Sequence, residues 1–499
     1  MCAVAILLSG TVGFLPIAAG DEPVTDGESA SEAWFVMKFD GKPVGFERVK
    51  SHVLPGTNPP QFSRVRRTRL KLQRLGQDLT VEATLITTES LTGHLLEFSL
   101  QRTDGSGARI ERSGRFLPEE RGYQVTDRAS ASVRTFDLQT DGVVQSPIVS
   151  TWLPSLVAEG IKRVTRPVLF PESMAVADVT AETRRSRRIH DDQRRSIEVT
   201  PIHFYPQLDP LKSTQFFVDA SGAVVRQEKR VLGGLLSMEL TTADQALAAI
   251  SGQPLDLDVR SLIPIDRLLS TGAERQQLVI DLTVKSGFLN DIPETAFQKV
   301  SRVDASTLRV TLTTPELPPI RANTSFRQAK QQAIPPTRWM QLEDPILQRM
   351  AATGSGGKTS DGEVCQQLER FVQSKIRHSA FSINLQSAAD VARTLRGDCT
   401  EHAVLLAALM RVNGIPSRVV GGLVHTNRQY GFMGHVWVEA LVEGQWIPFD
   451  SATSAHSHGT THLKLTHSNL NDETTGAISL FLPVLDLAGR AAIKVVSQQ

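Results

Sequence analysis

One cysteine near the C-terminal end of this chain has the surroundings of a nucleophile. Cys399 stands in the run RGDCTEH, and the apolar run AVLLAALMRV that follows it is typical of a helix. The helix is predicted to end at Asn413–Pro416, because Gly414 supplies a left-handed cap and Pro416 cannot continue a helix. Cys399 is therefore expected in the first turn, where the positive end of the helix favours a thiolate and N–H groups can bind an oxyanion.

A thiolate at this position needs a cationic partner, because Asp398 opposes the effect of the helix N-terminus. Histidine is the usual partner of such a thiol. Two later segments, HVWVEALV from His435 and QWIPFD ending at Asp450, are predicted to be strands joined at Glu443-Gly444. They supply a histidine and a carboxylate in the order that a nucleophilic triad requires.

The register of these two strands decides whether the carboxylate can reach the histidine. If the turn holds two residues, Val442 faces Gln445, and Asp450 stands opposite Trp437 and diagonal to His435. A three-residue loop would place Asp450 on the other face of the sheet. The spacing thus predicts that Asp450 orients His435.

These segments resemble the transglutaminase-like superfamily in its bacterial branch, through GDCTEHAVLLAALMRVNGIPSRVVGGL and then GHVWVEALVEGQWIPFDSAT. The resemblance covers residues 340 to 467 and implies a papain-like fold, with a cysteine at a helix N-terminus packed on an antiparallel sheet. It implies that Cys399 is the nucleophile, His435 the general base and acid, and Asp450 the orienting group. The implied reaction is acyl transfer from a carboxamide or peptide bond through a thioester. Thr400 follows the cysteine where the animal tissue enzymes carry Trp, so calcium-activated cross-linking is not expected.

Residues beside these motifs have a structural and a functional interpretation. Trp437 and Trp446 are expected to pack in the core, and lining of a substrate groove is the alternative. Glu401 and His402 are expected to support the first helical turn rather than to react. Cys365 is interpreted as a small core residue of a preceding helix.

Four histidines follow the strand that ends at Asp450, namely His456, His458, His462 and His467. Their spacing suits zinc, but no cysteine or carboxylate cluster completes such a site. The resemblance offers another interpretation, because the family often places a histidine just after this strand, where His462 stands. We therefore expect neither a metal nor a cofactor.

Composition narrows the class of protein. The chain has 54 basic and 53 acidic residues and is 40% hydrophobic, as in a folded protein without a general affinity for nucleic acid. Three cysteines cannot form a disulfide scaffold. Two basic runs, 64–74 and 184–195, are interpreted as solvated strand faces or loops, and binding of a cell-wall polymer or lipid headgroup is the alternative. Neither run contains the interleaved aromatic residues that single-stranded nucleic acid would need.

The organisation predicts an α+β chain in which a large antiparallel β-rich region precedes a C-terminal papain-like core. The apolar segment 2–19 and the small residues Ala18–Gly20 predict a signal peptide or anchor over 1–20. The further predicted parts are a disordered leader (21–33), an antiparallel β-rich domain (34–250) with a helix near 148–162, a small β domain (255–315), a linker (316–339), a catalytic domain (340–480) and a C-terminal segment (481–499).

The predicted function is that of an exported enzyme, in the periplasm, envelope or extracellular space, that transfers acyl groups from peptide or amide bonds. Its expected partner is a peptide or protein substrate, including cell-wall peptides. Hydrolysis is favoured over cross-linking. The alternative is a non-catalytic envelope-binding protein that retains the transglutaminase-like module, which the long β-rich region would suit.

Overall fold

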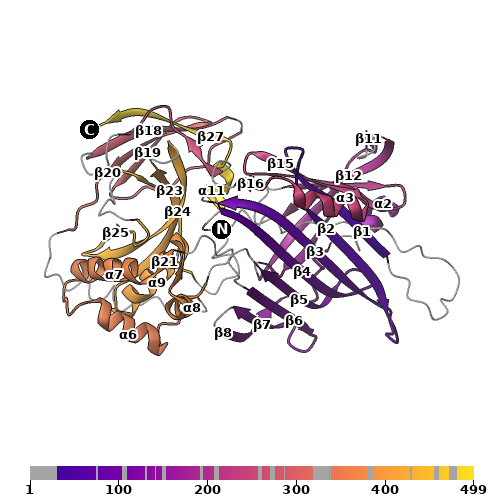
Figure 1. Cartoon of the computed structure of the whole chain (residues 1–499), viewed down its shortest axis with the longest axis horizontal. Coiled ribbons are helices and arrows are strands. Elements are labelled where there is room, and N and C mark those ends of the chain that lie inside the picture. The colour runs from indigo at the N-terminus through magenta and orange to yellow at the C-terminus, as the bar shows by residue number, and fades with distance from the viewer. Residues whose placement is uncertain are drawn as a thin grey trace. The chain divides into compact units, whose positions relative to one another are not determined.

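The computed structural model divides the chain into two compact units, one within Ala3–Leu257 and the other within Asp258–Gln499 (Figure 1). The described residues are 31–74, 77–103, 109–129, 132–140, 142–148, 153–172, 174–190, 195–206, 213–256, 261–269, 276–285, 287–318, 336–337, 339–378, 386–426, 430–453, 460–470, 480 and 482–499. The predicted signal peptide or anchor lies outside them, as do most of the predicted leader and linker. No helix within these ranges has the length and hydropathy needed to span a bilayer.

The N-terminal unit is built on one 16-stranded, mostly antiparallel sheet. Its strand order is β8-β7-β6-β5-β4-β3-β2-β1-β15-β14-β13-β12-β10-β9, with β11 paired to β12 and β16 to β3. The strands are β1 (Ser31–Phe39), β2 (Lys42–Leu54), β3 (Gln61–Arg74), β4 (Gln77–Ser90), β5 (Leu95–Thr103), β6 (Arg109–Leu117), β7 (Gly122–Ala129), β8 (Ser132–Gln139), β9 (Arg163–Phe170), β10 (Ala175–Thr183), β11 (Arg187–His190), β12 (Ser196–Pro206), β13 (Thr214–Asp219), β14 (Val224–Val231), β15 (Gly234–Thr241) and β16 (Leu255–Asp256).

Short helical elements accompany this sheet, namely α2 (Leu153–Ala158), α3 (Ala243–Ala248) and the 3₁₀ turn η2 (Ala249–Ser251). The helix predicted near 148–162 corresponds to α2 and is shorter than expected. β1 begins at Ser31, inside the predicted leader. β1 and β2 form a hairpin across Asp40-Gly41, and both turn residues have positive φ, 47° and 79°.

The basic run 64–74 departs from its favoured interpretation as a solvated strand face. It forms β3, where alternation sends successive side chains to opposite faces. Arg64 and Arg66 are buried and pair with Glu89 and Glu172 at 3.0 and 2.5 Å. Only the other face, with Arg67 among its residues, is exposed. Two of the run's arginines therefore hold buried ion pairs inside this unit.

The C-terminal unit combines helices with three sheets. Sheet B has the order β17-β24-β23-β26, with β25 on β24; sheet C has the order β19-β20-β18-β27; β21 and β22 form a two-stranded sheet. The strands are β17 (Ile263–Pro264), β18 (Gln277–Val284), β19 (Gln298–Asp304), β20 (Thr307–Thr313), β21 (Arg377–His378), β22 (Arg396–Gly397), β23 (Ser417–Thr426), β24 (Gly431–Val442), β25 (Gln445–Phe449), β26 (His462–Ser468) and β27 (Ala491–Gln498). The helices are α6 (Pro345–Gly354), α7 (Asp361–Lys375), α8 (Ala388–Thr394), α9 (Cys399–Val412) and α11 (Leu482–Leu487).

This arrangement divides the chain differently from the predicted domain boundaries. β27, from the predicted C-terminal segment, pairs with β18 of the predicted small β domain. β17, from the same small domain, pairs with β24 of the predicted catalytic domain. Long-range strand pairing therefore joins three predicted parts into one unit. The α+β class, with the large antiparallel region before the C-terminal core, is confirmed.

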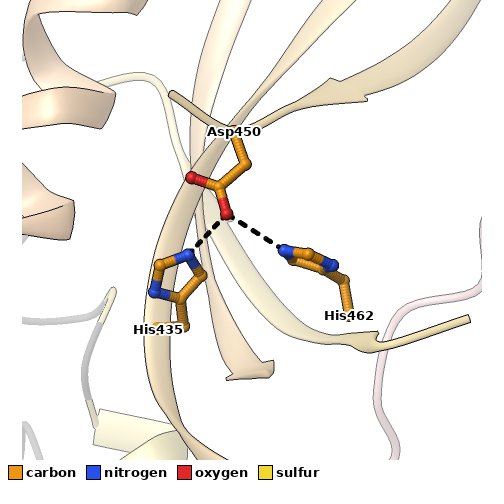
Figure 2. Close-up of side chains that lie close together, drawn as sticks. All are labelled: His435, Asp450 and His462. Atoms are coloured by element: carbon orange, nitrogen blue, oxygen red, sulfur yellow. Dashed lines mark hydrogen bonds and ion pairs between the residues drawn. The ribbon is translucent and has the colours of Figure 1, made fainter. Parts of the chain in front are cut away.

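The β24–β25 hairpin has the predicted register. Val442 pairs with Gln445 across Glu443-Gly444, whose φ angles of 48° and 81° suit a two-residue turn. Asp450 directly follows β25, and its carboxylate points at His435 of β24 (Figure 2). The turn thus brings the two side chains together, as the spacing predicts.

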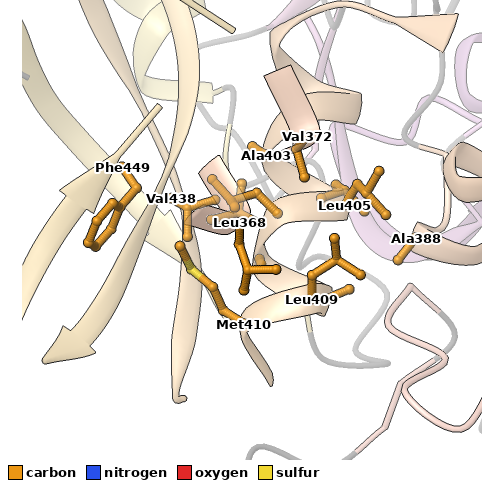
Figure 3. Packing of buried hydrophobic residues seen from close by; sticks show 14 of the residues in the cluster. Leu368, Val372, Ala388, Ala403, Leu405, Leu409, Met410, Val438 and Phe449 are labelled. Carbon is orange, nitrogen blue, oxygen red and sulfur yellow. The ribbon is translucent and has the colours of Figure 1, made fainter. Parts of the chain in front are cut away.

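α9 is the central helix of the C-terminal core. Nearly every residue from Thr400 to Arg411 is buried. Figure 3 shows Met410 directed toward Val438 of β24 and Leu409 on the side of α8. The helix is followed by Gly414 at φ 74°, as its sequence predicts. Burial on several sides fixes the position of the first turn, which carries Cys399.

Close packing of sheet B predicts a penalty at Gly422, which lies across from His435 in β23. A Cβ added there would lie 2.2 Å from the carbonyl oxygen of Leu463, which is backbone and cannot move aside. Gly422→Ala is expected to lower the free energy of unfolding by about 1–3 kcal/mol, measured by urea unfolding followed by tryptophan fluorescence.

The matched control is Gly362→Ala in α7. Its Cβ would meet Leu317 no closer than 3.4 Å, an ordinary contact. Alanine also favours the helix by up to about 1 kcal/mol over glycine. The control should leave stability unchanged or raised, and equal losses in both variants would contradict the packing argument.

Candidate active site

Cys399 is the first residue of α9, and its neighbours cap the helix. Asp398 is the N-cap, and its Oδ1 accepts from Thr400 N–H at 2.9 Å. In a capping box, its side chain also accepts from Glu401 N–H, and Glu401 Oε2 accepts from Asp398 N–H at 2.9 Å. In the described part of the chain, no acceptor takes the Cys399 N–H. The thiol is half-buried and free, whereas Cys365 is buried in α7. Cys399 therefore combines a free sulfur with an N–H group that can bind an oxyanion.

His435 links the thiol to a carboxylate. Its Nε2 donates to Asp450 Oδ2 at 2.7 Å (Figure 2). Its side chain also hydrogen-bonds to Cys399. Because Nε2 is engaged by the carboxylate, Nδ1 is the nitrogen left for sulfur. His435 and Asp450 are both buried. The structure thus brings together the three side chains that the sequence proposes.

An opening in the sheet edge permits the contact with sulfur. On the side of β24 away from β23, β25 pairs with Val438–Val442 and β17 with Gly431–Phe432. Among the described residues no strand pairs with 433–437 on that side. α9 packs on the face of β24 that carries Val436 and Val438, so its first turn can reach His435 around this open edge.

Burial and charge act in opposite directions on the His435–Asp450 pair. Burial disfavours protonated His435, but the charge and hydrogen bond of Asp450, together with Cys399, raise its pKa well above the usual value. Burial likewise disfavours ionised Asp450, but His435 and then His462 hold its pKa well below the usual value. The pair therefore favours an imidazolium beside a carboxylate, and this imidazolium can stabilise a thiolate.

Several groups that the sequence did not indicate hold Asp450 in place. Its N–H donates to Glu369 Oε1 of α7 at 2.7 Å. Its Oδ1 accepts from Ala452 N–H at 2.9 Å, and its Oδ2 accepts from the Thr453 hydroxyl at 3.1 Å. Glu369 lies 81 residues before Asp450, so no local pattern could have found it.

His462 is a second histidine on the same carboxylate. Its Nε2 lies 3.1 Å from Asp450 Oδ2, and its Nδ1 lies 3.0 Å from the Thr461 hydroxyl. His435, Asp450 and His462 each place one ligand-capable atom within 4.8 Å of the others, a set that zinc accepts. A metal bound there would replace the protons that these hydrogen bonds use.

His467, another histidine considered from the sequence, lies apart from this site. Burial first, then the charges of Arg418 and Lys464, lowers its pKa to about 4. His456 and His458 lie outside the described residues.

The two tryptophans proposed for a groove occupy different positions. Trp437 is 2% exposed, and its ring stacks on that of His435 with centroids 6.2 Å apart. It lines a small cavity of about 40 Å³ together with Phe297, Pro448 and His462. Trp446 lies away from the triad, with the Arg418 guanidinium 4.0 Å above its ring.

The remaining neighbours contact the site from the helix side. His402 of α9 places Nδ1 3.3 Å from the Ser451 hydroxyl, which follows Asp450. Glu401 is fully buried, and burial together with the charge of Asp398 raises its pKa well above the usual value. Both residues support the first turn of α9, as expected.

Comparisons with known proteins agree with this geometry for one part of the chain. The model of the transglutaminase-like superfamily (transglutaminase core) matches residues 348–451, which include Cys399, His435 and Asp450. The resemblance stated from the sequence is therefore confirmed over these residues. A search of curated proteins found no match.

Solved structures are similar only at low identity. A candidate cysteine protease from Cytophaga hutchinsonii is 17% identical and matches 45% of this chain and 89% of its own, with a TM-score of 0.28. A beta-barrel-like protein of a domain of unknown function from Brucella abortus is 12% identical over 42% of this chain and 95% of its own, with a TM-score of 0.33. A structure described as a TGase is 11% identical over 37% of this chain and 53% of its own, with a TM-score of 0.20.

The pKa directions predict how the His435–Asp450 pair contributes to stability. The raised pKa of His435 contributes to the free energy of unfolding. This contribution is complete below pH 6.5, the pKa of the unfolded state, and disappears as the pH rises through the pKa of the folded state. The lowered pKa of Asp450 contributes as well; this contribution is present above pH 3.8, the pKa of the unfolded state, and disappears as the pH falls through the pKa of the folded state. Asp450→Asn should therefore cost most between about pH 4 and 6.5, by about 3 kcal/mol.

This difference is measured as the free energy of unfolding of both proteins from pH 3 to 9. The exposed Asp78 provides the control, because Asp78→Asn should give a small difference that varies little with pH. A difference for Asp450→Asn that did not change with pH would show that the pair is not ionised in the folded protein.

Proposed function

We propose, starting from the membership of residues 348–451 in the transglutaminase-like superfamily, that this chain is an exported cysteine-dependent enzyme that cleaves peptide or amide bonds. The observation that carries the proposal is the hydrogen-bonded series of Cys399, His435 and Asp450. A nucleophilic thiol, an imidazole that can hold and release a proton, and a carboxylate that orients the imidazole are the groups that such acyl transfer requires.

The reaction runs through a thioester. The Cys399 thiolate attacks the carbonyl carbon, and the Cys399 N–H binds the oxyanion. His435 then gives its Nδ1 proton to the leaving amine as the C–N bond breaks, which leaves the thioester and a neutral imidazole. Next His435 takes a proton from water, and the hydroxide attacks the thioester. The carboxylic acid leaves, and the thiolate and imidazolium are restored.

Hydrolysis is the preferred outcome because water needs no acceptor site of its own. An amine in place of water would give cross-linking by the same steps. Thr400 stands where the animal cross-linking enzymes carry Trp, which also disfavours that outcome.

The open edge of β24 supports an extended peptide as substrate. In a two-residue hairpin the flanking residues exchange hydrogen bonds, so Val442, Ala440 and Val438 direct their main-chain groups toward β25. The residues between them direct their main-chain groups toward β23. Leu441 N–H, for example, donates to Pro416 O. Val436 and the half-buried Gly434 therefore direct N–H and C=O groups toward the open edge, on either side of His435. A strand-like substrate could pair there and place its carbonyl at the thiol.

A non-catalytic envelope-binding protein is the alternative that the sequence leaves open. A module retained only for binding has no need of hydrogen bonds between thiol, imidazole and carboxylate. Cys399, His435 and Asp450 keep these bonds, which favours the enzyme.

The first test is chemical labelling of Cys399 by an electrophilic amide probe. We expect a single adduct on the peptide that contains Cys399, because His435 hydrogen-bonds to this thiol and can take its proton. Since the proposal includes export through residues 2–19, a probe that does not cross the cytoplasmic membrane should label the protein in intact cells. Mass spectrometry of the digested protein identifies the site.

Two variants give this experiment its controls. Cys399→Ala should abolish labelling and reduce peptide hydrolysis by at least about a thousandfold. Cys365→Ala, which removes the buried cysteine, should label like the wild type. If Cys399→Ala were still labelled on the peptide that contains position 399, or still hydrolysed peptides, Cys399 would be rejected as the nucleophile.

The second test addresses the substrate. If an extended backbone pairs with the edge at Gly434 and Val436, methylation of one substrate backbone nitrogen near the cleaved bond should lower kcat/KM by about tenfold or more, since a main-chain hydrogen bond is lost and its partner stays buried. The same methyl group placed several residues away is the control. Equal rates for all three peptides would exclude strand-like binding.

A further inference from the structure

Two buried carboxyl groups flank the proposed nucleophile, and the reaction steps use neither. Asp398 is 4% exposed and Glu401 is fully buried. They stand directly before and two residues after Cys399 in the first turn of α9. An ionised carboxylate at either position opposes a thiolate on Cys399, so the charge of this pair matters for the reaction.

The two residues are in direct contact, since Asp398 N–H donates to Glu401 Oε2 at 2.9 Å. Burial, then the charge of Asp398, raises the pKa of Glu401, and a hydrogen bond between the two side chains raises it further. A carboxylate only accepts hydrogen bonds, so a bond between two carboxyl groups requires that one of them carries a proton. Within the described residues Glu401 Oε1 has no protein partner, which again disfavours a second full charge on this side chain.

The packing around Glu401 excludes both water and cations. Its side chain lies over Gly397, where an added Cβ would be 2.3 Å from the Cβ of Glu401. The charged groups that act on it are Asp398 and Cys399, both negative when ionised. Arg377 and Arg396 of the neighbouring two-stranded sheet are exposed, and neither pairs with Glu401. His402, the next residue of α9, contacts Ser451 instead.

We propose that Glu401 is a protonated positioning residue that shares its proton with Asp398, so that the pair carries one negative charge beside Cys399. The proposal rests on the proposed role of Cys399 as nucleophile. The shared proton keeps Asp398 ionised and oriented as the N-cap while it limits the negative charge next to the thiolate. The imidazolium of His435 then balances the thiolate beside one buried carboxylate instead of two.

The test uses the reactivity of the Cys399 thiol to report the charge of the Asp398–Glu401 pair. The rate of Cys399 alkylation by iodoacetamide is measured against pH in the full-length protein, and its midpoint reports thiolate formation. Glu401→Gln keeps the size and the hydrogen bonds of the side chain but is always neutral. We expect its midpoint and its rate at pH 7 to match the wild type within about twofold, because the wild-type side chain is already neutral.

A double variant makes the assay sensitive to charge. Asp398→Asn combined with Glu401→Gln removes the one remaining charge, and its midpoint should fall by about one pH unit. A fall of that size in Glu401→Gln alone would overturn the proposal, because it would mean that Glu401 is ionised in the wild type. A double variant that matches the wild type would overturn it as well, since no charge would then act on the thiol.

Infrared difference spectroscopy gives a readout that depends neither on the thiol nor on a substrate. The wild type at pH 7 should display the C=O band of a buried carboxylic acid, and Glu401→Gln should lack it. Absence of the band in the folded wild type would reject the shared proton. If the wild type hydrolyses no peptide while the alkylation and infrared results are as expected, the proposed function is rejected. The proton-sharing pair is then still supported.

Discussion

The C-terminal unit depends on one constraint: an imidazole on a β-strand must contact, at the same time, a thiol on a helix and a carboxylate that directly follows the neighbouring strand. The carboxylate is supplied by the tight turn between β24 and β25, which fixes the register of Asp450 against His435. The thiol is supplied by α9, whose burial on several sides fixes the position of its first turn. Because α9 lies on the face opposite to the His435 side chain, the contact can form only where the edge of β24 is open.

The charge at the N-terminus of α9 differs from what the helix dipole alone would give. The sequence suggests that the first turn of α9 stabilises a thiolate through its positive end. In the structure the caps use the N–H groups of Asp398, Thr400 and Glu401 and place two carboxyl groups there. The imidazolium of His435, held by Asp450, is therefore the principal stabiliser of a thiolate, and the Cys399 N–H remains for the oxyanion.

Local sequence signals predicted the parts of the site that local interactions determine. The caps of α9 and the two-residue turn at Glu443-Gly444 are each encoded within a few residues, so the cysteine position and the strand register followed from them. Glu369 escaped prediction because its bond to Asp450 spans 81 residues. His462 was noticed, but its hydrogen bond to Asp450 depends on how β26 joins the sheet through β23.

The same limit explains the domain boundaries and the basic run. Neither the pairing of β27 with β18 nor that of β17 with β24 leaves a pattern in the residues concerned, because any strand of suitable alternation could fill the place. Arg64 and Arg66 appear equivalent to Arg67 in sequence. Only the strand's place in the large sheet, and the distant Glu89 and Glu172, decide which side is buried.

Sheet C limits how a substrate can approach the site. Gln298 of β19 bonds the backbone of Lys464 in both directions, accepting from its N–H at 2.8 Å and donating to its carbonyl at 2.9 Å. One side chain thus takes the place of a strand partner and attaches sheet C to β26, which also carries His462. Residues of sheet C and its connections then cover the face of sheet B that carries Trp437, where they enclose a cavity of about 40 Å³ with it. With α9 on the opposite face, the edge of β24 between β17 and β25 is the approach left within the described structure, and a flat, extended chain fits an edge better than a bulky side chain does.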